Sequence, residues 1–87
     1  MKMPDINTKQ LIIDYHKYHG DYNICPISEI QHPDGGHVWL VHMRNQKGEK
    51  FSTLDMIGHD NEGEYVSELF GMERSREDEM IQTYLEL

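Results

Sequence analysis

A change in hydrophobic periodicity at Gly20 constrains the fold of this chain more than any other feature of the sequence. Before Gly20, apolar residues recur at the three- and four-residue spacing of a helix. After it, apolar and polar residues alternate in short runs separated by turn-forming residues, which is typical of strands. We therefore expect an α+β fold in which one helix is followed by an antiparallel sheet.

The first helix is predicted over residues 8–19. Asn7 is a suitable N-cap, and Gln10 stands at the third helical position, where it can complete a capping box. Gly20 supplies the stop signal, because glycine tolerates the left-handed backbone that commonly follows the last helical residue.

Three strands are predicted, over residues 27–31, 37–44 and 50–57. Pro26 cannot donate a ladder hydrogen bond, so the first run is either an edge strand or begins after the proline. The second run is apolar on both faces, which indicates a central strand. Asn45-Gln46-Lys47-Gly48 has the composition of a tight turn and joins the second and third strands as a hairpin.

Two short helices are predicted at the C-terminal end. Asn61 and Glu64 resemble a capping box ahead of the first, and Ser75 and Asp78 resemble another ahead of the second. The expected order is α-β-β-β-α-α, with a three-stranded antiparallel sheet that carries its helices on one face. At 87 residues the chain suits a single domain spanning residues 1–87.

The charge of the chain is unevenly distributed. The net charge is −8, and all of it falls in residues 51–87, whereas acidic and basic residues balance over residues 1–50. Such a field repels phosphates and attracts cationic partners, so direct nucleic-acid binding is disfavoured. The alternative explanation is a solvated face that keeps the protein soluble.

The sequence favours binding over catalysis. Cys25 precedes a proline and lies far from any glycine-rich turn, and no phosphate-binding loop or nucleophile elbow is present. We expect no catalytic residue and no cofactor. No segment approaches the roughly 20 apolar residues of a membrane span, and one cysteine cannot form an internal disulfide, so we expect a cytoplasmic protein without membrane contact.

The leading functional hypothesis is a non-enzymatic regulator or inhibitor that presents its acidic C-terminal helices to a basic protein surface, such as that of a nucleic-acid-binding protein. Six carboxylates and two tyrosines are the expected contacts: Glu64, Glu68, Glu73, Glu77, Asp78, Glu79, Tyr65 and Tyr84. The second hypothesis is a small metal-responsive or metal-dependent hydrolytic protein. Its ligands would be His32, Asp34 and His37, on either side of the first strand-to-strand loop.

A homodimer is also consistent with the sequence. The last predicted helix carries an apolar stripe that is larger than the core of one 87-residue domain is expected to cover: Met80, Ile81, Tyr84 and Leu85. Twofold pairing of this stripe would remove it from water.

Overall fold

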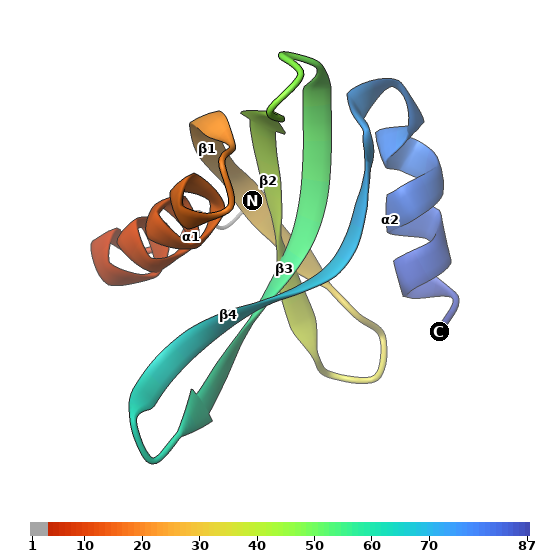
Figure 1. Ribbon diagram of the computed structural model, residues 1–87. Helices are drawn as coiled ribbons and strands as arrows, with labels where there is room; N and C mark the ends of the chain where they lie inside the picture. The colour runs from red at the N-terminus through yellow and green to blue at the C-terminus, as the bar shows by residue number, and fades with distance from the viewer. Residues whose placement is uncertain (1–3) are drawn as a thin grey trace.

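The computed structural model describes residues 4–87 and contains one four-stranded antiparallel sheet with a helix on each face (Figure 1). The sheet order follows the chain, β1-β2-β3-β4. In sequence the elements are α1 (Ile6–Tyr18), β1 (Tyr22–Gln31), β2 (His37–Arg44), β3 (Lys50–Asp60), β4 (Gly63–Glu73), the 3-10 turn η1 (Arg74–Arg76) and α2 (Glu77–Leu85). The expected α-β-β-β-α-α order with three strands is therefore wrong, and the observed order is α-β-β-β-β-α.

The error lies in the segment that follows β3. Asn61 and Glu64 do not cap a helix; they flank a hairpin turn in which Gly63 adopts a φ of +118°. From this turn β4 pairs with β3 along its whole length, as far as Glu73 opposite Phe51. A helix here would leave the backbone N–H and C=O groups along that side of β3 to water, whereas in the observed fold they face β4.

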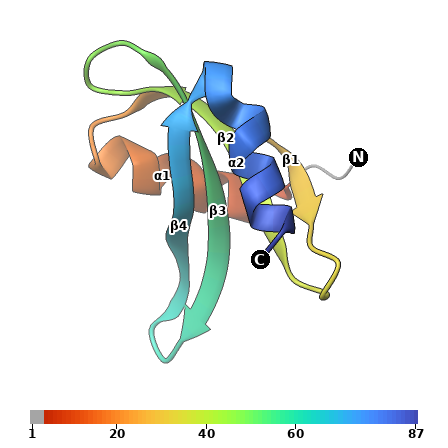
Figure 2. The same cartoon turned by 90° about the vertical axis from the view of Figure 1, so that its right-hand side faces the viewer.

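The helices lie on opposite faces of the sheet, not on one face as expected (Figures 1 and 2). Each covers its own apolar cluster, and β2 contributes to both because its side chains alternate between the faces. The buried cluster beneath α1 consists of Ile12, Trp39, Val41 and Met43. The buried cluster beneath α2 consists of Val38, Leu40, Leu54, Met80 and Tyr84. The position of β2 between β1 and β3 confirms that it is a central strand.

The apolar stripe of α2 packs on the chain's own sheet. Met80 is 0% exposed and Tyr84 is 6% exposed, and Ile81 and Leu85 are partly buried against the same cluster. The stripe is therefore largely covered within one copy of the chain, so its burial does not by itself require a dimer.

The turns at the ends of α1 and β2 follow the sequence signals closely. Gly20 has a φ of +90° after α1, and Gly48 has a φ of +78° in the β2–β3 turn, so both use the backbone region that glycine tolerates best. The N-cap of α1 is Asp5 and not Asn7, because an Asp5 Oδ1 accepts a hydrogen bond of 2.8 Å from the Thr8 N–H. Neither helix in residues 4–87 is long and apolar enough to cross a membrane.

Candidate functional site

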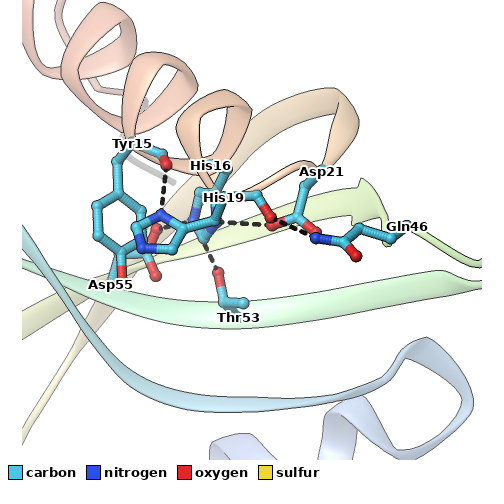
Figure 3. Close-up of polar contacts among 7 residues, drawn as sticks. All are labelled: Tyr15, His16, His19, Asp21, Gln46, Thr53 and Asp55. Carbon is cyan, nitrogen blue, oxygen red and sulfur yellow. Dashed lines mark hydrogen bonds and ion pairs between the residues drawn. The ribbon is translucent and has the colours of Figure 1, made fainter.

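Three ionisable side chains from three different elements meet beneath α1. They are His16 of α1, Asp55 of β3 and Glu68 of β4, and one ligand-type atom of each lies within 4.8 Å of the others. The His16 Nε2 and Asp55 Oδ2 atoms are 2.6 Å apart, and both side chains are 0% exposed. Thr53 places its Oγ1 at 3.4 Å from the same histidine nitrogen (Figure 3). We call His16, Asp55 and Glu68 the polar cluster.

Local geometry explains how these side chains reach one point. His16 follows Ile12 by four residues and so shares the buried face of α1. Asp55 lies two residues after Thr53, and the alternation of β3 turns both toward α1. Asp55 and Glu68 are direct partners in the β3–β4 register, an arrangement that repels two carboxylates unless a cation lies between them.

The other side of the His16 ring faces Asp21. The His16 Nδ1 lies 3.4 Å from Asp21 Oδ2, but within residues 4–87 it makes no hydrogen bond, and the same is true of Asp55 Oδ1. The loop that carries Asp21 is fixed, since the Asp21 N–H donates to the His16 carbonyl at 3.0 Å. Gln46 adds a second restraint by donating to the His19 carbonyl at 2.9 Å, as Figure 3 shows.

Two members of the polar cluster, His16 and Glu68, have shifted pKa values. Burial lowers the pKa of His16, but the hydrogen bond and charge of Asp55, together with the charges of Glu68 and Asp21, outweigh burial, so the pKa lies above its ordinary value. Burial and the neighbouring Asp55 raise the pKa of Glu68. Burial and the same carboxylates raise the pKa of Tyr15. Tyr15, His16 and Glu68 therefore retain their protons more strongly than the same groups in water, as expected where negative charges crowd together.

An open pocket of about 370 Å³ adjoins the polar cluster. Asp21, Thr53 and Glu68 line it, so the pocket reaches the cluster at Glu68, while His16 and Asp55 lie buried behind its wall. The rest of its wall comes mainly from the β2–β3 turn and the start of β3: Asn45, Gln46, Lys47, Glu49 and Phe51. With three carboxylates and one lysine in its wall, the pocket suits a cation better than an anion.

The eight residues expected to contact a partner fall into two groups. Glu64, Tyr65, Glu68 and Glu73 lie on β4, whereas Glu77, Asp78, Glu79 and Tyr84 lie on α2.

The α2 group is largely engaged within the chain. Glu77 Oε1 accepts hydrogen bonds from His42 Nε2 at 2.5 Å and Ser52 Oγ at 2.8 Å. Glu79 accepts one from Arg76 at 2.7 Å. Tyr84 belongs to the core, so it is not an exposed anchor.

The loop histidines proposed as metal ligands pack in different places. The His32 ring contacts Tyr84 at a centroid distance of 5.1 Å, and the His37 ring contacts Trp39 at 5.7 Å. Tyr84 and Trp39 belong to the clusters on opposite faces of the sheet. The His32 Nδ1 is also occupied, because it accepts a hydrogen bond of 3.0 Å from the Asp34 N–H.

Sequence reasoning missed the polar cluster. His16 carried a weak signal, as a histidine on the apolar face of a helix, but Asp55 and Glu68 gave none until the strand register was known. Comparisons with protein-family models, curated proteins and solved structures find no match to this chain, so the case for its function depends on the geometry of these residues.

Proposed function

We propose that the protein binds an extended, basic segment of a partner protein along the free edge of β4, and that it acts as a regulator or inhibitor and not as an enzyme. The observation that carries this proposal is the position of β4 (Gly63–Glu73), an 11-residue strand whose sole neighbour in the described sheet is β3. One side of its backbone is therefore free to pair with another strand.

The charge beside this edge supports a basic partner. Glu64 and Glu68 lie on the face of β4 that is turned toward α1, since Val66 between them packs in the cluster beneath that helix. Glu64 also lines a second open pocket, about 390 Å³ in volume, with Asp14 of α1. Lysine or arginine side chains of an added strand would meet these carboxylates at alternate positions.

An apolar contact is available on the same strand. Tyr65 is 47% exposed, and its ring lies over Gly58 on β3, where an added Cβ would come within 2.4 Å of the ring's Cζ atom. Because Gly58 has no side chain, the Tyr65 ring can pack closely against the backbone of the hairpin while part of the ring stays exposed. A preordered aromatic side chain loses little entropy when it contacts a partner.

The part of β4 suited to pairing is its first half. The β3–β4 register shifts between Leu54 and Asp55, where Leu69 is the extra residue on β4. Such a bulge bends a strand and discourages regular pairing beyond it. We therefore place the partner segment beside residues 63–68, in the half of β4 that begins at the projecting tip of the β3–β4 hairpin (Figures 1 and 2).

The test is selection from a displayed library of random peptides of about 12 residues, long enough to span β4 at roughly 3.3 Å per residue. We expect enrichment of peptides that alternate Lys or Arg with β-branched residues. A triple charge reversal of Asp14, Glu62 and Glu64 to lysine should weaken the selected peptides by at least about tenfold at low salt. Raising the ionic strength to roughly 0.15 M should shrink that difference.

The control is a triple reversal of equal charge placed elsewhere, at Asp34, Asp78 and Glu86. Glu68 is left unchanged in both variants because it also belongs to the polar cluster. Equal loss of binding in the two variants would mean that net charge alone attracts the peptides. That result, or selection of peptides with no basic residues, would contradict the proposal.

A further inference from the structure

We propose that the polar cluster of His16, Asp55 and Glu68 is a binding site for a divalent first-row transition-metal ion such as Zn²⁺. The three side chains offer one imidazole nitrogen and two carboxylate oxygens, all within 4.8 Å of one another. Mixed nitrogen and oxygen ligands suit Zn²⁺ and its neighbours in the series better than Mg²⁺ or Ca²⁺, which prefer oxygen alone.

The burial of two of these ligands is an independent reason to expect an ion. His16 and Asp55 are 0% exposed, and Asp55 Oδ1 has no hydrogen-bond partner within residues 4–87. Buried carboxylate oxygens are normally hydrogen-bonded, because an unsatisfied one carries a desolvation cost. An ion beside Asp55 would supply the missing interaction.

The charge around the site points the same way. Asp21, Asp55 and Glu68 surround one histidine, and no Lys or Arg of the described residues forms an ion pair with any of them. Even with His16 protonated, the carboxylates outnumber the positive charges. A divalent cation would offset this excess at the point where the carboxylates converge.

The site requires only a small adjustment to accept an ion. Ligands about 2.0–2.2 Å from zinc lie roughly 3.3 Å from one another in a tetrahedral site. The His16 Nε2 to Asp55 Oδ2 distance must therefore increase from 2.6 Å, while the Glu68 carboxylate moves inward. Glu68 belongs to the edge strand and is exposed, so its side chain has room to move. The ion would replace the hydrogen bond between His16 and Asp55.

The surroundings supply the remaining parts of a metal site. Asp21 lies 3.4 Å from His16 Nδ1, the position from which a carboxylate orients a ligating imidazole. The adjoining pocket gives the ion an entry path and leaves room for water in its other coordination positions.

The competing explanation is a buried His16–Asp55 pair that only fixes α1 on the sheet. Calorimetric titration of the untagged, metal-free protein with ZnCl₂ separates the two, with CoCl₂ and its visible absorption as a second probe of coordination. We expect one site with a Kd below about 10 μM, or roughly −7 kcal/mol. Glu68→Gln keeps the size of the side chain and leaves the buried pair in place, so it should fold and yet weaken Zn²⁺ binding at least about tenfold.

The matched control is Glu64→Gln, on the same strand and the same face. It removes the carboxylate that lies 3.5 Å from His59 Nε2, so it also tests for adventitious zinc binding at this exposed pair. Binding in this variant should stay within about twofold of the unmodified protein, since no proposed ligand is lost. A Kd above 10 μM, or Glu64→Gln weakening binding as much as Glu68→Gln, would overturn the proposal. So would tight binding that Glu68→Gln leaves unchanged.

Discussion

Glu77 should act as an anchor of α2, and its removal provides a direct test of the fold. Its carboxylate accepts hydrogen bonds from His42 at 2.5 Å and Ser52 at 2.8 Å, and these two residues lie opposite each other on β2 and β3. One carboxylate at the start of α2 thus holds the helix to two central strands. Glu77→Ala deletes both contacts and leaves the Ser52 hydroxyl, which is 0% exposed, without its acceptor.

The expected cost can be worked from these contacts. A hydrogen bond to a charged group contributes about 1.5–3 kcal/mol, and solvent screening reduces this where the groups are partly exposed. The side chains of His42 and Glu77 are 26% and 21% exposed, so the lower end of that range applies. We expect Glu77→Ala to lower the free energy of unfolding by roughly 2–4 kcal/mol, which corresponds to about 10 °C or more in Tm for a domain of this size.

Asp78→Ala is the matched control. Asp78 is the next residue of the same helical turn and is exposed, so its loss should remove only a favourable interaction with the helix dipole, about 0.3–1 kcal/mol. Urea denaturation monitored by circular dichroism gives the free energy of unfolding of both variants. Equal m-values would show that the two unfolded states match. If the two variants lose equal stability, Glu77 is a surface carboxylate and the anchoring role is refuted.

Two further predictions concern the two faces of the sheet. Met80→Ala should cost about 2–5 kcal/mol by opening a cavity beneath α2, and the unfolding midpoint should not change with protein concentration, because the stripe is buried within one chain and not between copies. On the α1 face, the raised pKa of His16 means that the folded state binds its proton more tightly than the unfolded state does. We therefore expect the unmodified protein to have a higher free energy of unfolding than His16→Gln when both are measured with a chelator present. The difference should be complete below pH ~6.5 and decline as the pH rises further. A difference that grows with pH would contradict this.

The elements predicted correctly from the sequence are those specified by local signals. The strand predicted over residues 37–44 is β2 without a change of boundary. The first helix begins at Ile6 and not Thr8, since Asp5 and not Asn7 caps it, and it ends at Tyr18, one residue before the predicted end. In each case the information lies within a few residues, in a turn glycine or an alternation that can be recognised without knowing the rest of the fold.

The segment 61–71 was predicted wrongly because two local patterns coincide there. Asn61 and Glu64 have the spacing of a capping box, and the residues after them are also suited to a strand. What decides between the two is pairing with β3, which extends along the whole segment. That pairing is non-local, so periodicity within the segment did not reveal it.

The candidate site was beyond prediction for a related reason. His16 and Asp55 are 39 residues apart, and their contact depends on how α1 crosses the sheet. The loop histidines His32 and His37 are near each other in sequence, yet their rings pack against opposite faces. Proximity along the chain was therefore a poor guide to which polar side chains would meet.

The topology also changes what the acidic half of the chain can do. A single acidic surface was expected from residues 51–87, but β4 and α2 divide these carboxylates between an edge strand and the opposite face. On α2, Glu77 and Glu79 are paired within the chain, which leaves β4 as the part with the most carboxylates available to a partner. Glu68 is the one residue shared by the β4 edge and the polar cluster. An ion bound there would use the charge of Glu68 and reduce the attraction of β4 for a basic segment, so zinc and a basic peptide should each weaken the binding of the other.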